Sequence, residues 1–161
     1  MRAGMAATPA VRRGLRHPSP QVRDACCWIL DHFMDEGSIP DLLARLADED
    51  EGVRGAALHA LACDKCKQGT CRPGEAEVLS VAIRMLREDP SRRVRTHAAG
   101  VVGNAVHRSD EARRALEQAR DRDPHPMVRK AAGWYAPGGS IYRRLRPKPP
   151  QRGQRVPMAP R

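Results

Sequence analysis

The apolar residues of this chain recur with the period of an α-helix. Five segments carry apolar side chains at spacings of three and four residues, and none alternates strictly as a half-buried strand does. These segments are residues 39–46, 53–61, 78–85, 94–105 and 112–119. Helix starts are indicated at Thr8-Pro9, at Ser38 and at Ser109, since hydroxyl side chains and an early proline favour the first turn. The pattern predicts an all-α protein.

A short motif repeats along the chain. The dipeptide Val-Arg recurs at Val22, Val53, Val94 and Val128, at intervals of 31, 41 and 34 residues. The longest interval contains an insertion, residues 64–73, and removing these ten residues leaves 31. A polar residue stands five positions before each valine and begins a turn; these residues are His17, Asp48, Asp89 and Asp123. A period of about 30 to 40 residues is typical of stacked helical repeats, so each unit is expected to form two helices.

The segment Asp89-Pro90-Ser91-Arg92-Arg93-Val94-Arg95 and its three counterparts, with Ile39-Pro40-Asp41-Leu42-Leu43, resemble HEAT repeats. The resemblance is in particular to the short bacterial HEAT-like kind also found in phycobilisome lyase subunits, and it covers about residues 7–137. It implies a right-handed α-solenoid of about four helical hairpins that serves as a binding scaffold. In that family the turn Asp and the second-helix Arg commonly form a polar ladder between repeats. The matching residues are Asp48, Asp89 and Asp123 with Arg23, Arg54, Arg95 and Arg129, and the first repeat departs with His17 in place of Asp.

Composition narrows the kinds of site that the repeats can build. The 161 residues are 40% hydrophobic but only 3% aromatic, so the core must consist of Ala, Leu, Val and Ile. A large cofactor pocket lined by aromatic rings is therefore not expected. Trp28 and Trp134 fall at second-helix positions, where we expect core or cap residues rather than a platform for stacking bases.

The net charge of +10 belongs to the two ends of the chain. Residues 1–17 carry four Arg and no acid, and residues 138–161 carry seven Lys or Arg and no acid, which leaves −1 for the remainder. Residues 1–6 are expected to be flexible. Residues 138–161 are rich in Pro and poor in apolar side chains, so a disordered basic tail is expected there. Its candidate contacts to a polyanion are Arg143, Arg144, Arg146, Lys148, Arg152 and Arg155.

The insertion carries three of the five cysteines, with the spacing C-x2-C-x4-C. His59 stands four residues before Cys63, which places the two on one face of a helix. If the loop returns Cys66 and Cys71 to the same point, these four residues offer a Cys3His set that suits one structural zinc ion.

Two other readings of the insertion stay open. The cysteines are also consistent with free thiols in a reducing compartment, and less so with one pair forming a disulfide, because no secretion signal is evident. His59 is also consistent with a packing or surface residue. Cys26 occupies a position held by Ala in the other repeats. We therefore expect Cys26 to be a core residue. If the His59 side chain points away from the cysteines, Cys26 is the alternative fourth zinc ligand.

The sequence shows no glycine-rich phosphate loop, nucleophile elbow or other catalytic set, so an enzyme is not expected. The leading interpretation is a non-catalytic scaffold or adaptor that binds an unidentified protein. The alternatives are nonspecific nucleic-acid binding through the Arg-rich ends, and an accessory subunit of a lyase-type enzyme, the latter by resemblance alone. Without an 18-residue apolar run or a signal-peptide pattern in residues 1–10, no membrane span and a cytoplasmic location are expected.

Overall fold

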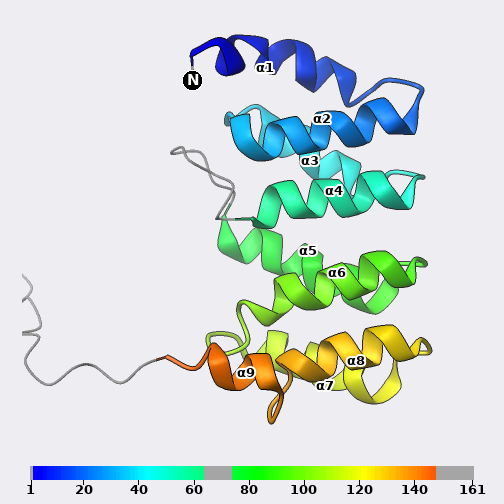
Figure 1. The fold of residues 1–161 in the computed structure, drawn as a ribbon, viewed down its shortest axis with the longest axis vertical. Coiled ribbons are helices and arrows are strands. Elements are labelled where there is room, and N and C mark those ends of the chain that lie inside the picture. Colours follow the sequence, from blue (N-terminus) through cyan, green and yellow to red (C-terminus); the bar gives the residue numbers. More distant parts are fainter. Residues whose placement is uncertain (1, 64–73, 148–161) are drawn as a thin grey trace, which may run out of the picture.

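The computed structural model describes residues 2–63 and 74–147, with side chains described from residue 7 onward. Within these ranges every regular element is a helix, as the apolar period predicts (Figure 1). The elements are α1 (Arg2–Gly14), α2 (Pro20–Phe33), α3 (Ser38–Arg45), α4 (Glu51–Ala62), α5 (Glu75–Glu88), α6 (Arg92–Gly103), α7 (Asp110–Arg122), α8 (Pro126–Tyr135) and α9 (Ser140–Arg144).

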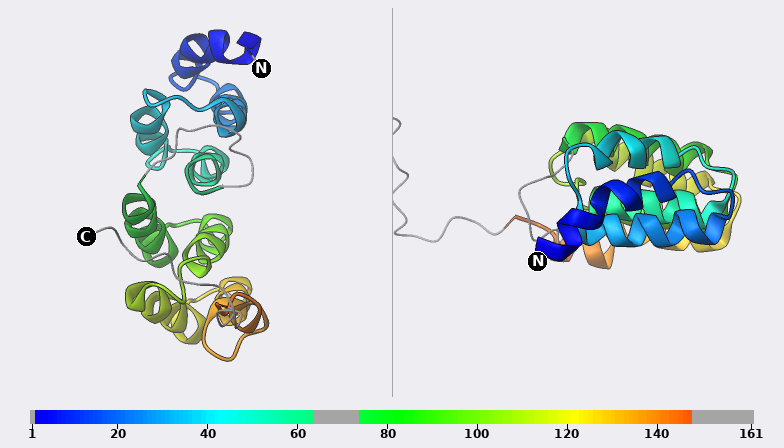
Figure 2. Two further views of the ribbon diagram at one scale, coloured as in Figure 1. Left: turned by 90° about the vertical axis from the view of Figure 1, so that its left-hand side faces the viewer. Right: turned by 90° about the horizontal axis from the view of Figure 1, so that it is seen from above.

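The helices stack in two rows. In one row α2 contacts α4, α4 contacts α6 and α6 contacts α8, while α5 contacts α7 in the other row. Each even-numbered helix from α2 to α8 also contacts the helix that precedes it in the chain. The two rows stand side by side in the left view of Figure 2, with α1 at one end of the stack and α9 at the other.

The core lies between the two rows and consists of small and branched aliphatic side chains. Leu30, Leu58, Val102, Leu42 and Leu116 are fully enclosed. The buried position four residues after each repeated valine is Cys26, Ala57, Ala98 or Ala132. Small side chains at this position let successive second helices approach closely, because little volume separates their backbones.

The starts of α4, α6 and α7 form the caps that hydroxyl and acidic residues favour. The Ser109 Oγ accepts a hydrogen bond from the Ala112 N–H, and the Asp50 Oδ1 accepts one from the Gly52 N–H. The start predicted at Thr8 is wrong, since α1 already begins at Arg2. Thr8 is buried, and its hydroxyl donates to the Phe33 carbonyl at the end of α2, so it joins two helices instead of capping one.

The two ends of the stack also differ from expectation. Residues 2–6, which were expected to be flexible, are part of α1. The tail expected to be disordered from residue 138 includes α9. Tyr142 anchors it, because the His107 and Tyr142 rings lie 4.3 Å apart and His107 Nε2 lies 2.8 Å from the Tyr142 carbonyl oxygen. Lys148, Arg152 and Arg155 lie outside the described residues, as does the insertion.

Across residues 2–63 and 74–147, no helix combines the length and the apolar character that crossing a bilayer requires.

Candidate functional site

The predicted ladder residues meet at the turns between helices. Arg54 of α4 donates from Nε and Nη2 to the two carboxylate oxygens of Asp89, both at 2.8 Å. Its Nη1 donates to the carbonyl oxygens of Asp48 and Glu49 in its own turn. Two further pairs repeat this two-pronged arrangement, namely Arg23 with Asp48 and Arg95 with Asp123. Each arginine therefore holds its own turn and the turn of the next repeat.

The two ends of the ladder are different from its middle. Arg129 donates to the carbonyl oxygens of Asp123 and Pro124, but it forms no ion pair with a described carboxylate, and it is only half-buried. At the other end, His17 Nδ1 accepts a hydrogen bond from the Ser19 N–H at 3.0 Å. At the equivalent position of the next repeat, the Asp48 Oδ1 accepts the corresponding bond from the Asp50 N–H. The imidazole thus replaces the aspartate as a turn cap, although it does not pair with an arginine from a preceding repeat.

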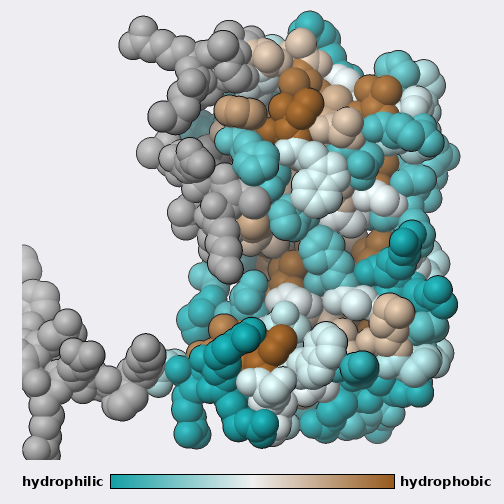
Figure 3. Space-filling view, in the orientation of Figure 1, coloured by the Kyte–Doolittle hydropathy of each residue, from teal (hydrophilic) through white to brown (hydrophobic). Residues whose placement is uncertain are grey.

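The outward-facing side chains of α2, α4, α6 and α8 form what we call the second-helix face, which is turned toward the viewer in Figures 1 and 3. Three aromatic rings follow one another across it: Trp28 lies 4.8 Å from His59, and His59 lies 5.8 Å from His97, measured between ring centroids. Figure 3 shows this face as a mixture of apolar and polar side chains.

The prediction that Trp28 and Trp134 are core or cap residues is wrong. Trp28 is 46% exposed and Trp134 is 45% exposed. Both stand six residues after the repeated valine, and this position turns outward on the second helices. Ile29 and Phe33 of the same helix are also exposed, so α2 carries several large apolar side chains on the outside of the molecule.

A groove of about 500 Å³ crosses α2, α4 and α6 on the second-helix face. Its charged side chains are three carboxylates and one guanidinium, contributed by Asp24, Asp50, Glu51 and Arg93. The groove is therefore acidic in a protein whose total charge is +10. Burial raises the pKa of Asp24, as does the nearby Asp50 carboxylate, although a hydrogen bond with Trp28 opposes the shift.

His97 also lines the groove. Burial lowers its pKa, and the neighbouring His59 lowers it further. The uncharged imidazole therefore adds no positive charge to the acidic lining near neutral pH.

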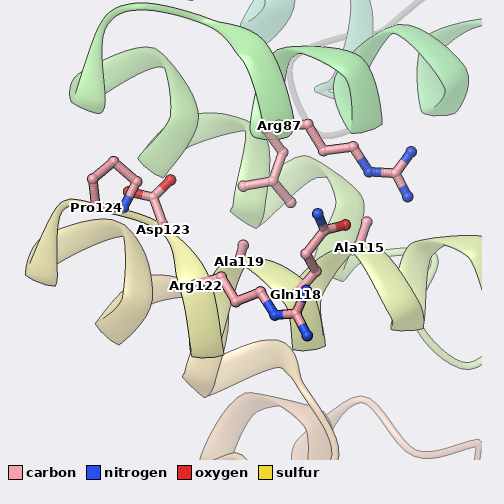
Figure 4. Close-up of a pocket in the computed structure, with 8 residues that line it drawn as sticks. Arg87, Ala115, Gln118, Ala119, Arg122, Asp123 and Pro124 are labelled. Atoms are coloured by element: carbon pink, nitrogen blue, oxygen red, sulfur yellow. The ribbon is translucent and has the colours of Figure 1, made fainter.

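A second pocket lies between α5 and α7 and holds about 110 Å³ (Figure 4). Its lining includes Arg87, Gln118, Arg122 and Asp123. Asp123 is already bonded by Arg95, and the volume suits only a few water molecules. This pocket is a packing gap between first helices.

A cluster of metal-ligating side chains lies where α2 and α4 end. One ligand atom from each of Asp31, His59 and Cys63 lies within 4.8 Å of the others. His59 Nε2 is 3.4 Å from Asp31 Oδ2. The structure thus brings together two of the four predicted ligands, while Cys66 and Cys71 lie outside the described residues.

Asp31 is the member of this cluster that the sequence reasoning missed. It is 1% exposed, and neither of its carboxylate oxygens has a hydrogen-bond partner in the described part of the chain. The repeat register held a signal, since the equivalent positions in the next two units are Ala62 and Gly103. A carboxylate at a position that is otherwise small could have been recognised as unusual.

Cys26 and Cys27 lie in the core, away from this cluster. The Cys26 thiol packs against Gly14 of α1 and contributes no atom to the group of ligands. Burial raises the pKa of Cys27 to about 12. Neither thiol is therefore placed to serve as the reserve ligand.

The basic residues at the two ends of the chain lie at opposite ends of the stack. Arg143, Arg144 and Arg146 are exposed on and after α9. In α1 and the turn that follows it, Arg12 and Arg16 both bond to Asp41, at 2.7 and 3.1 Å. Part of the N-terminal positive charge is therefore neutralised within the fold.

Residues 2–62 match the family described as HEAT repeats. No curated protein matches the chain.

Proposed function

Because residues 2–62 match the family described as HEAT repeats, we propose that the chain is a HEAT-repeat protein and a non-catalytic scaffold that binds another protein through the second-helix face. We further propose that its helix pairs form four hairpins wound into a right-handed solenoid. The observation that carries the proposal is the exposed Trp28 beside the acidic groove. Exposed tryptophans with apolar neighbours are typical of interface centres.

The charges of the groove indicate the kind of segment that fits. Asp24, Asp50 and Glu51 favour a partner segment with Lys or Arg side chains, and the Trp28 ring offers a cation a face on which to stack. Ile29 and Phe33, exposed on α2 outside the groove lining, offer further apolar area to a partner that also covers this helix. We infer that the partner contributes a basic segment flanked by apolar side chains.

The acids of the groove support a binding role rather than a catalytic one. The Asp50 carboxylate caps α4 through the N–H groups of Gly52 and Val53. Glu51 lies 3.5 Å from Arg93 and also accepts a hydrogen bond from Ser91. Both carboxylates are thus held in structural bonds, and both still contribute negative potential to the groove.

We propose that the protein acts in the cytoplasm.

The test compares two exposed tryptophans. Tagged wild-type chain, Trp28→Ala and Trp134→Ala are used to capture proteins from the native cell, and captured proteins are quantified by mass spectrometry. We expect one partner to be lost with Trp28→Ala and with the charge reversal Asp24→Lys, but retained with Trp134→Ala, which lies outside the groove. A partner captured equally by all four proteins would contradict the assignment to this face.

Nucleic-acid binding through the Arg-rich ends is the second candidate, and the exposed side chains of Arg143, Arg144 and Arg146 favour it. The acidic groove would repel phosphates, so contact would be confined to the ends. A gel shift that weakens steeply with added salt would support this function. The third candidate, an accessory subunit of a lyase-type enzyme, rests on resemblance alone. Enzyme activity that is restored only when this chain is reconstituted with a second subunit would test it.

A further inference from the structure

We propose that Asp31, His59 and Cys63 form a binding site for a divalent transition metal, with zinc as the expected ion. The three residues offer one carboxylate oxygen, one imidazole nitrogen and one thiolate sulfur. All three atom types are zinc ligands, and the thiolate disfavours hard cations such as magnesium and calcium. This site is separate from the proposed partner-binding function.

The distances suit a shared metal ion. Zinc bonds of about 2.0 to 2.3 Å place tetrahedral ligands roughly 3.3 to 3.8 Å apart. Asp31 Oδ2 and His59 Nε2 are already 3.4 Å apart. The full set lies within 4.8 Å, so small rotations of side chains at the helix ends bring the third ligand to bonding range.

The state of Asp31 is the independent observation that points to a cation. Its side chain is enclosed, and both oxygens are without a hydrogen-bond partner among the described residues. A buried carboxylate without a partner is strongly unfavourable, and a bound cation removes that penalty. The fold thus holds a buried negative group whose nearest basic neighbour is His59 Nε2, 3.4 Å from Oδ2, and a bound cation would stabilise it further.

The helix ends strengthen the preference for a cation. Asp31 lies in the last turn of α2. Cys63 caps the C-terminus of α4, where its N–H donates to the His59 carbonyl oxygen at 2.8 Å. The C-terminal ends of helices carry partial negative charge, which disfavours a carboxylate and favours a cation. Two such ends and the Asp31 carboxylate therefore meet at one point.

The neighbouring ring holds one ligand in position. The His59 ring packs 4.8 Å from the Trp28 ring, which limits its rotation, while Nε2 is directed to Asp31. A ligand fixed by its surroundings loses less conformational freedom when the metal binds.

The experiment measures zinc affinity by competition with a chromophoric chelator, on full-length reduced protein that has been stripped of metal. We expect about one zinc per chain for the wild type. Asp31→Ala, His59→Ala and Cys63→Ser should each weaken binding by more than about tenfold. Asp31→Ala is compatible with the fold because Ala62 occupies the same place in the next repeat.

Matched controls remove the same kinds of side chain nearby. Asp24→Asn changes a carboxylate seven residues earlier on α2, and His97→Ala removes the adjacent ring. Both should keep the wild-type zinc affinity. Zinc should also raise the melting temperature of the wild type but not that of Asp31→Ala. Cobalt bound in place of zinc should give a sulfur-to-metal absorption band in the wild type, and this band should be lost in Cys63→Ser.

Three results would overturn the proposal: a wild-type protein that binds no zinc, an Asp31→Ala variant that binds it as tightly as the wild type, or equal loss in the controls. The double variant Cys66→Ser, Cys71→Ser separates this site from one built by the insertion. Zinc retained there supports the proposal. Zinc lost there but kept in Asp31→Ala would assign the metal to the insertion instead.

Discussion

The Arg54 Nε lies 2.8 Å from the Asp89 Oδ2, although the insertion of residues 64–73 separates the two residues in the chain. Both side chains are buried, and the guanidinium bonds both carboxylate oxygens. The ladder therefore continues from the second unit to the third as it does between the others.

Removing one member of this buried pair should destabilise the whole stack. Arg54→Ala leaves the Asp89 carboxylate buried without its partner, which costs about 3 to 5 kcal/mol in free energy of unfolding. Arg93→Ala is the control, because its ion pair with Glu51 is exposed and should contribute no more than about 1 kcal/mol. Chemical denaturation followed by circular dichroism measures both. Equal losses in the two variants would refute a stabilising role for the ladder.

The stability of the protein should fall in acid partly through Asp48. Burial alone would raise the pKa of Asp48, but hydrogen bonds from Arg23 and from the Asp50 N–H, together with the charges of Arg23 and Arg45, lower it below its ordinary value. Because the folded-state pKa lies below the unfolded value of about 3.9, this stabilisation is present above that pH and is lost as the pH falls through the folded-state pKa.

The variant Asp48→Asn checks this dependence. Its deficit in stability relative to the wild type should be largest near neutral pH and should shrink below about pH 4. Melting temperatures measured from neutral to acidic pH give the comparison. A deficit that stays constant over the whole range would mean that the ionised carboxylate adds nothing.

Two glycines of α6 should respond in opposite ways to substitution by alanine. A Cβ on Gly103 would overlap the ring of Tyr135, whereas a Cβ on Gly100 would lie 3.5 Å from the Tyr135 hydroxyl oxygen. Gly103→Ala should therefore destabilise the protein by about 1 to 3 kcal/mol. Gly100→Ala should be neutral or stabilising by up to about 1 kcal/mol, since alanine favours the helix.

Thermal melts of the two glycine variants distinguish these effects. Adding Tyr135→Ala to each variant shows whether the ring is the cause, because the extra loss from Gly103→Ala should then disappear. If both glycine variants were equally stable, close packing of Tyr135 against α6 would not be the reason that position 103 holds a glycine.

Two truncations should separate the end of the fold from the tail. Deleting residues 148–161 should leave the melting temperature unchanged, whereas deleting residues 138–161 also removes α9 and the contact between Tyr142 and His107, and should lower it. The shorter deletion removes four of the seven positive charges of residues 138–161.

Affinity for a polyanion should therefore fall in two steps, and most steeply at low salt. Fluorescence anisotropy with a labelled oligonucleotide at two salt concentrations measures this. Binding that is unchanged in the longer deletion would exclude the C-terminal arginines as the contact.

The sequence by itself determined the class of fold, and its resemblance to HEAT repeats implied which residues belong to the ladder. The helical period of Val53, Ala57 and Leu61 identifies one face of a helix, because burial on one side requires that spacing whatever lies opposite. Each unit carries an Arg one residue after its repeated valine, and the last three carry an Asp five residues before it, so the register assigns Arg54 and Asp89 to successive units. Repeats that contact only their neighbours make such a register readable without long-range information.

Only the tertiary structure decided which side of the second helices is covered, and what meets at their ends. Trp28 and Leu30 are both large and apolar, but the first is exposed and the second is buried. The helix period gives their relative directions, not which direction faces the other row. Asp31 and His59 lie 28 residues apart in different units, and their closeness depends on how α2 packs against α4. No local pattern encodes that distance, because it is set by the volumes of the side chains between the two helices.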